Sequence, residues 1–179
     1  MVRQYSQTLT GFMLQHFHKR LLIFAGLLAG VLITSAGCDS QAQQDDFAAQ
    51  ASLPPSGFTA TDTSGDVLSE DEDDWRSSPF YLGKVRVTPL YPNPGNIDFV
   101  TVPINILQFD TGAGGFSLRA YEAGSSQLIL LDRLLAINGP GGYIMRFSPA
   151  IIGRKGLVRI FVFDGMNEIV SYGDLMIQN

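Results

Sequence analysis

The sequence is poor in the side chains that most enzymes use for nucleophilic and metal chemistry. Its 179 residues include one cysteine and two histidines, and both histidines, His16 and His18, lie near the N-terminus. Without that N-terminal segment no histidine remains, and Ser-His-Asp catalysis, Cys-His catalysis and zinc binding are excluded. A phosphate-binding Gly-Lys-Ser/Thr loop and a dinucleotide fingerprint are also missing. We therefore predict a protein without enzymatic activity, cofactor or metal.

Two enzymatic arrangements do not need histidine: a pair of carboxylates and a Ser-Lys dyad. Each acid or lysine that could contribute stands at a predicted strand end or turn, where a solvated charge is the ordinary case. We expect none of them to be catalytic. These residues are Asp110, Glu122, Asp132, Asp164, Lys84 and Lys155.

The one cysteine, Cys38, follows a basic and then apolar N-terminus. Lys19 and Arg20 precede an apolar run over 21–36, which is shorter than the roughly 20 residues needed to cross a bilayer. Small residues, ending in Gly37, lead into the cysteine. This order resembles the signal of bacterial lipoproteins, which are cleaved before the cysteine and carry lipid on its sulfur.

The lipoprotein resemblance implies a signal peptide over 1–37, cleavage between Gly37 and Cys38, and a membrane anchor on Cys38. It places the protein at the cell envelope of a Gram-negative-type bacterium, with the membrane and the leaflet left open. Ser35 stands where such signals usually have Leu, so cleavage without lipidation remains an alternative. Met1 and Met13 are both possible starts.

The segment after the cysteine is acidic. Residues 38–74 contain ten acidic residues and no basic one, whereas residues 75–179 contain nine basic and seven acidic residues. Few large apolar side chains occur before Trp75, so we predict a disordered tether over 38–78. A flexible chain of that length spans roughly 35 Å. A calcium loop starting at Asp62 is the alternative, but Val67 stands where its sharp turn needs glycine.

From residue 79 onward the pattern is typical of strands. Short segments of alternating polarity are separated by turns rich in Gly, Pro, Asn and Asp, which predicts an all-β fold. Residues 128–137 also fit a helical period, but all their neighbours are strands. We predict one antiparallel β-sandwich of immunoglobulin or fibronectin type III kind over 79–179. Its seven strands are expected over 84–88, 99–106, 116–120, 127–135, 143–147, 157–163 and 168–177.

The turn formed by Tyr91, Pro92, Asn93 and Pro94 opens a second resemblance. Together with the strands 116–124, 142–147 and 156–160, it resembles the Ig-like domain of flagellar hook-capping proteins and the type A C-terminal sorting domain of type IX secretion cargo. The resemblance implies a sandwich opened by a stiff corner. A further hairpin, 161–177, runs past the point where sorting domains end. The resemblance therefore supports the fold more strongly than it supports a role as secretion cargo.

The predicted partners are a membrane, through the lipid anchor, and an unidentified envelope protein. Nucleic acid is not expected, because a surplus of two basic residues over 75–179 is too small. Phe161 and Phe163 lie on one face of a strand that is apolar on both faces, so they are either covered or form an interaction patch. A glycan is the alternative ligand, for which the available aromatic residues are Trp75, Tyr81, Tyr91, Tyr121 and Tyr172.

Overall fold

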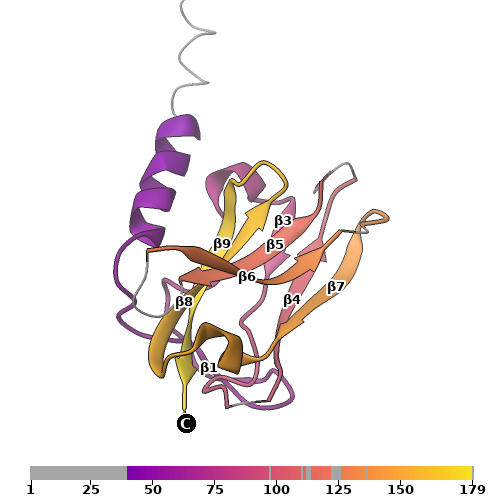
Figure 1. Cartoon of the computed structure of the whole chain (residues 1–179). Coiled ribbons are helices and arrows are strands. Elements are labelled where there is room, and N and C mark those ends of the chain that lie inside the picture. Colours follow the sequence, from indigo (N-terminus) through magenta and orange to yellow (C-terminus); the bar gives the residue numbers. More distant parts are fainter. Residues whose placement is uncertain are drawn as a thin grey trace, which may run out of the picture. The chain divides into compact units, whose positions relative to one another are not determined.

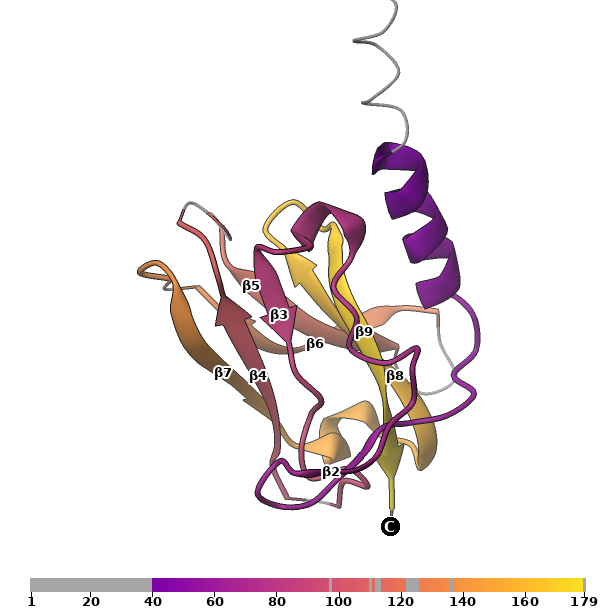
Figure 2. The ribbon, with the colours of Figure 1, turned by 180° about the vertical axis from the view of Figure 1, so that it is seen from behind.

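The computed structural model describes residues 40–96, 98–109, 111, 114–121, 126–135 and 137–178. Seven of its strands form two antiparallel sheets, a three-stranded sheet in the order β3-β4-β7 and a four-stranded sheet in the order β6-β5-β8-β9 (Figures 1 and 2). The chain is thus an all-β sandwich. Its strands are β3 (Val85–Val87), β4 (Val100–Ile106), β5 (Phe116–Tyr121), β6 (Leu128–Leu134), β7 (Gly141–Phe147), β8 (Gly156–Asp164) and β9 (Ile169–Ile177).

These seven strands coincide with the seven that the sequence predicts, including 128–134, where the helical alternative is wrong. Several short elements accompany them. Residues 40–51 are helical, and a two-stranded sheet pairs β1 (Ala60–Thr61) with β2 (Val67–Ser69). Two 3-10 helices follow, η1 (Pro79–Tyr81) and η2 (Pro149–Ile152).

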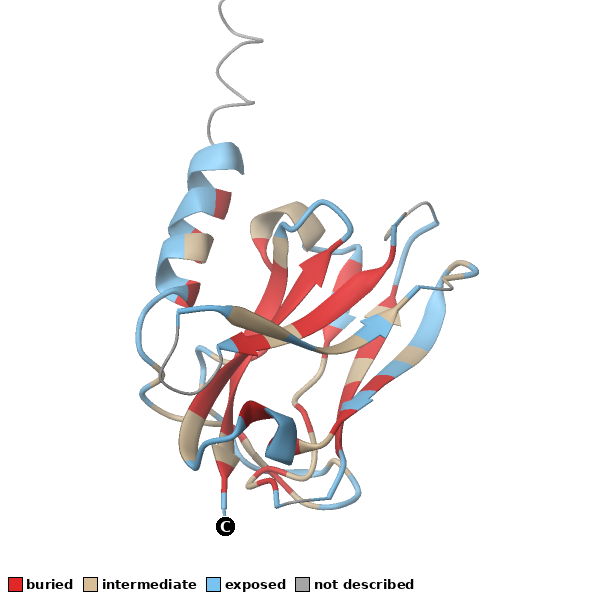
Figure 3. Cartoon of the chain, in the orientation of Figure 1, coloured by how far each residue is buried: buried red, intermediate tan, exposed pale blue. Residues whose placement is uncertain are grey.

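The main core lies between the two sheets and follows from the alternation of β4. Val100, Val102, Ile104 and Ile106 point to the same face, as expected from a two-residue period, and each is at most 2% exposed. Facing them across the sandwich are alternate residues of β5 and β8, so each sheet contributes one apolar face. Buried residues accordingly occur in both sheets (Figure 3). Those facing residues are Phe116, Leu118, Ala120, Val158, Ile160 and Val162.

A second, smaller core lies on the other face of the four-stranded sheet. Phe161 and Phe163 are 3% and 8% exposed, and with Tyr172 they pack against Phe47 and Ala51 of the helical segment. The ring centroids of Phe47 and Tyr172 are 5.1 Å apart. The alternative of an exposed Phe161–Phe163 interaction patch is therefore wrong. A strand that is apolar on both faces needs cover on both, and here the helix provides it.

The acidic segment differs from the predicted disordered tether, and the domain does not begin at residue 79. The compact unit that holds the sandwich begins at Gln44. Trp75 is buried in the main core, and its amide donates to the carbonyl of Tyr172 at 2.7 Å. Asp62, Asp71 and Asp74 accept amide hydrogen bonds with their carboxylates, as Asp62 does from Ser64 and Asp66. Three apolar residues of this segment, Phe47, Ala51 and Trp75, are buried in the two cores of the sandwich and hold the segment on it.

Candidate functional site

The two residues of the predicted processing site, Gly37 and Cys38, lie outside the described residues. Over the residues that are described, no helix is long and apolar enough to cross a membrane. The helical segment 40–51 is amphipathic instead. Gln44, Phe47 and Ala51 share its buried face.

The predicted turn at Tyr91, Pro92, Asn93 and Pro94 is a structural clamp. Both of its X-Pro bonds are cis. The fully buried Asn93 side chain donates to the carbonyls of Thr59 at 2.7 Å and Asp174 at 2.9 Å, and it accepts from the amide of Met176 at 3.0 Å. The turn therefore ties the segment before the sandwich to the outer edge of β9.

The carboxylates considered for catalysis have local structural roles where the structure describes them. Asp132 accepts from the amides of Arg133 and Arg146. Asp164 accepts from the amides of Met166 and Glu168 and from the hydroxyl of Tyr81. Burial raises the pKa of Tyr81, and the hydrogen bond to Asp164 and the charge of that carboxylate add to the rise.

The other candidates add no cluster. Lys84 and Lys155 are exposed, whereas Asp110 and Glu122 lie outside the described residues. In the described ranges, no group of three or more His, Cys, Asp or Glu side chains could hold a metal ion.

The aromatic residues considered for glycan binding do not form one exposed row. Trp75 and Tyr172 are buried, on opposite faces of the four-stranded sheet. Tyr81 packs edge-on against Phe116, and Tyr121 packs edge-on against Phe161. The interpretation of Trp75 and Tyr172 as surface aromatics is therefore wrong, because each completes one of the two cores.

A buried ion pair, absent from the predictions, holds the helical segment in place. The Arg159 guanidinium donates from Nε and Nη2 to the two carboxylate oxygens of Asp174, both at 2.8 Å. Its Nη1 also donates to the carbonyls of Gln50, Ala51 and Leu53, at 2.7 to 3.2 Å. These carbonyls lie at the C-terminal end of the helix, where a cation is favourable. Arg159 therefore joins strand β8 to the segment that covers it.

A second carboxylate, Asp74, adjoins this ion pair. It accepts from the amide of Thr59 at 2.7 Å and from the amide of Asp174 at 2.9 Å. Burial raises the pKa of Asp74 from 3.8 to about 7; the two amide hydrogen bonds oppose this rise and the charge of Asp174 adds to it. For Arg159, burial lowers the pKa but the pairing with Asp174 prevails, and its pKa is raised.

A surface cleft of about 380 Å³ opens beside Arg159, and we call it the Arg159 cleft. One wall is the segment 51–55 that follows the helix, and the other includes Tyr121 and Arg154. Leu53 is largely exposed at its rim, and Phe161 lies at its buried side. The Arg159 guanidinium is already paired with Asp174 and the helix carbonyls, so the exposed cation of the cleft is Arg154. Apolar walls beside an exposed guanidinium suit a peptide segment with an acidic or carbonyl group.

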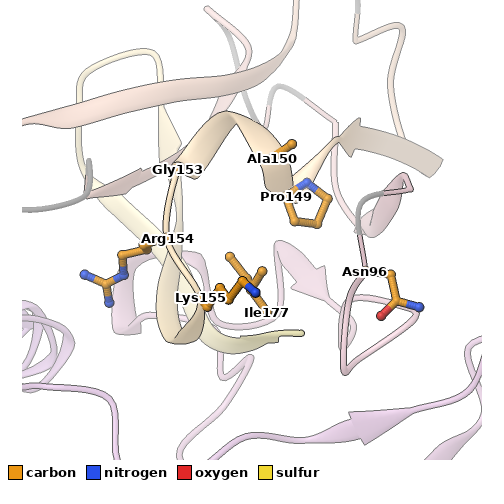
Figure 4. A pocket seen from close by; sticks show the side chains of 7 residues that line it. All are labelled: Asn96, Pro149, Ala150, Gly153, Arg154, Lys155 and Ile177. Atoms are coloured by element: carbon orange, nitrogen blue, oxygen red, sulfur yellow. The ribbon is translucent and has the colours of Figure 1, made fainter. Parts of the chain in front are cut away.

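A smaller cavity of about 210 Å³ lies near η2 (Figure 4). Its lining includes Asn96, Pro149, Lys155 and Ile177. Arg154 also borders it, but its guanidinium donates to the carbonyl of Leu157 and points away from the other lining side chains. One free lysine beside apolar walls does not make a site for a specific ligand.

The loops that follow β4, β6 and β8 meet at one end of the sandwich, opposite the C-terminus, and we call this the loop end (Figure 1). A methyl group on Gly139 would meet the ring of Phe109 at 3.3 Å, and one on Gly114 would meet Gly165 at 3.3 Å. The helix η1 joins them through the hydrogen bond from Tyr81 to Asp164. Apolar side chains at this end are exposed, namely Leu82, Leu107, Phe109, Leu135 and Met166.

No family model and no curated protein sequence matches the chain. Among solved structures, it is similar to the sensor domain of the anti-sigma factor RsgI4 of Pseudobacteroides cellulosolvens, with 11% identity, a TM-score of 0.39 and coverage of 52% of this chain and 92% of that one. It is also similar to a candidate lipoprotein from Bacillus anthracis, with 10% identity, a TM-score of 0.43 and coverage of 73% and 91%.

Proposed function

We propose that this protein is a cell-envelope lipoprotein, anchored through Cys38, whose non-catalytic β-sandwich binds another envelope protein. The observation that carries the proposal is the order of the N-terminus: two basic residues, an apolar run over 21–36 that ends in small residues, then Gly37 and the chain's one cysteine. This order fits a cleaved signal better than a spanning helix. The envelope of a Gram-negative-type bacterium is the proposed location.

The absence of enzymatic activity is part of the same proposal. The sequence has no histidine after residue 18, which removes the base that most activated serine and cysteine nucleophiles require. The carboxylates of Asp132 and Asp164 accept backbone amides in local turns and strands. A binding role is compatible with this fold, because binding needs a shaped surface and no reactive side chain.

The strand order supports a finer assignment of the fold to the fibronectin type III kind. In a constant-type immunoglobulin domain the fourth strand lies in the sheet of the first. Here the fourth strand of the sandwich, β6, pairs with the third, β5. That places the first, second and fifth strands in one sheet and the other four in the second.

We propose the Arg159 cleft as the surface that binds a protein partner. Strand addition at the sheet edges is less suitable, because segments 74–78 and 93–95 already bond to the outer edge of β9. On β7 the Asp132 carboxylate occupies the amide of Arg146. At the cleft, by contrast, Leu53 and Tyr121 present apolar surface beside Arg159. A partner would enter it with an apolar side chain and with an acceptor group for the exposed Arg154.

The anchor is tested by mass spectrometry of the N-terminus of the purified protein, compared with Cys38→Ser. We expect acyl chains on residue 38 and membrane association in the native protein, and loss of both in the variant. More than one chain is needed for durable attachment, at about 0.8 kcal/mol per buried methylene. A free thiol at position 38 in protein that fractionates without membrane would overturn the proposal.

The partner is tested with a photo-crosslinking amino acid at Leu53, with Ile151 as the control. Both side chains are exposed and apolar, but Ile151 lies on η2, outside the cleft. We expect a discrete protein adduct from position 53 in intact envelopes and none from position 151. The same diffuse adducts from both positions, or saturable binding to a glycan array instead, would contradict a protein partner at the cleft.

A further inference from the structure

We propose that the loop end lies against the bilayer and that its exposed apolar side chains enter the headgroup region. The proposal rests on the proposed anchor at Cys38. A disordered tether would let the domain stand roughly 35 Å from the membrane. The structure leaves a much shorter connection, because the chain is already fixed to the domain at Gln44.

Gln44 shows where the anchoring segment leaves the domain. Its side chain is 2% exposed; Nε2 donates to the carbonyl of Ile169 at 3.1 Å and Oε1 accepts from the amide of Phe80 at 3.4 Å. Ile169 begins β9, directly after the β8–β9 loop, and Phe80 belongs to η1. Both contacts therefore place Gln44 at the loop end.

The covalent chain then limits how far the anchor can be from this end. Gln44 is six positions after Cys38 in the sequence, and an extended chain spans at most about 3.6 Å per residue. Cys38 therefore lies no more than about 22 Å from Gln44. Acyl chains on Cys38 enter the bilayer directly, so the membrane surface comes close to the loop end and stays far from the C-terminal end.

The loop end has the side chains for such a contact. Leu82, Phe109, Leu135 and Met166 are 71% to 78% exposed. Leu82 follows η1, and the other three come from the loops after β4, β6 and β8. Side chains of this kind bury 5 to 10 Å deep at the boundary of headgroups and acyl chains. Exposure of each of these side chains to water is unfavourable, and together they form an apolar patch that contact with an apolar surface would cover.

Exposure alone does not select this end, because the opposite end also carries exposed apolar residues. Leu68, Phe99 and Ile151 are 69%, 69% and 55% exposed. What distinguishes the two ends is the position of Gln44. The opposite end therefore supplies matched control positions, with similar chemistry and exposure but far from the proposed membrane.

Charge does not drive the proposed contact. Lys84 is exposed at the loop end, but so are Glu168 and, on the helix next to Gln44, Asp45 and Asp46. Such a surface gains little from anionic lipids, since each basic residue contributes about 1 kcal/mol near an anionic membrane and acidic residues oppose it. The contact should therefore change by less than about twofold between 50 mM and 500 mM salt.

The test uses the lipidated full-length protein in vesicles of phosphatidylethanolamine and phosphatidylglycerol, three to one. Acylation of Cys38 leaves no other thiol in the chain, so one new cysteine can carry an environment-sensitive fluorophore. Leu135→Cys and Met166→Cys report on the loop end; Leu68→Cys and Ile151→Cys are the controls. We expect a severalfold rise in fluorescence, and quenching by spin-labelled lipid, at 135 and 166 and neither effect at 68 and 151.

Equal responses at the two ends, or no response at 135 and 166, would overturn the proposal. A response at 135 and 166 that appears in native envelopes but not in protein-free vesicles would also overturn it, by assigning this end to a protein partner. Mass spectrometry of the same samples separates the two proposals. A non-acylated Cys38 contradicts the lipoprotein function itself, whereas an acylated Cys38 with a water-exposed loop end contradicts only the docking geometry.

Discussion

The outer face of one sheet is covered by the rest of the chain, whereas that of the other is exposed. On the four-stranded sheet, Phe161, Phe163 and Tyr172 lie beneath the helical segment. On the three-stranded sheet, Ile144 and Arg146 of β7 are exposed. The difference follows from the strands themselves, since β8 is apolar on both faces whereas β4 and β7 alternate. A strand that is apolar on both faces thus signals a covering element elsewhere in the chain.

The largest expected effect is on Arg159, which connects that covering element to its sheet. Arg159→Met leaves Asp174 buried without its partner and frees the three carbonyls at the end of the helix. We expect the free energy of unfolding to fall by about 3 to 5 kcal/mol, measured by urea denaturation. Arg146→Met, on the open sheet, should change it by less than about 0.5 kcal/mol. Similar losses in both variants would contradict the comparison.

Phe47→Ala tests the cover itself. It removes the ring that packs on Tyr172 at 5.1 Å and opens a cavity above Phe161 and Phe163. Truncation of a buried Phe typically destabilises by about 3 kcal/mol or slightly more, and amide exchange over 44–51 should accelerate. Phe99→Ala removes the same side chain from an exposed position and should be almost neutral. Unchanged amide exchange in Phe47→Ala would show that the helix does not depend on this ring.

The raised pKa of Asp74 predicts that stability falls as the pH rises. Between pH 3.8 and about 7 the folded protein keeps the Asp74 proton and the unfolded chain does not, so folding becomes less favourable through this window. After allowance for partial solvation, the loss is about 1 to 2 kcal/mol. Asp74→Asn should flatten the slope of unfolding free energy against pH, whereas Asp73→Asn, an exposed neighbour, should retain it. An unchanged slope in Asp74→Asn would refute the assignment.

The smallest expected effect is on the open sheet. Ile144→Thr replaces an exposed β-branched side chain with a smaller, polar β-branched one, and we expect a change within about 0.5 kcal/mol. Phe161→Thr, at the corresponding outward position of the covered sheet, should cost several times more, because it removes an aromatic ring from a packed layer. Equal urea midpoints for the two variants would show that the helix covers little.

The sandwich strands were predictable because their signals are local. Alternation places Val100, Val102 and Ile104 on one face, and glycine-rich or proline-rich turns separate the strands. The ordered structure of the acidic segment was not predicted, because the average composition of 38–78 conceals the few residues that pack on the sandwich. The spacing of Gln44, Phe47 and Ala51 at i, i+3 and i+7 was the available signal for a helix with a buried face.

The buried ion pair was predictable in part. Arg159 shares a strand face with Phe161 and Phe163, so a cation on an otherwise apolar face marks a buried arginine in need of a partner. That partner depends on a bulge. Phe163 pairs with Ile169, and uninterrupted counting from there would place Gly173 opposite Arg159, but the register shift at Val162/Phe163 brings Asp174 there. A single extra residue in a strand cannot be located from alternation alone.

The ion pair between Arg159 and Asp174 also affects the order in which parts of the domain can fold. The helix it holds lies among the first described residues to be synthesised, whereas β8 and β9 are the last strands. Phe47 and Ala51 therefore have no surface to cover until β8 and β9 have emerged, and contacts this distant in sequence form slowly. A truncation within β9 should therefore also detach the N-terminal helical segment from the sheet.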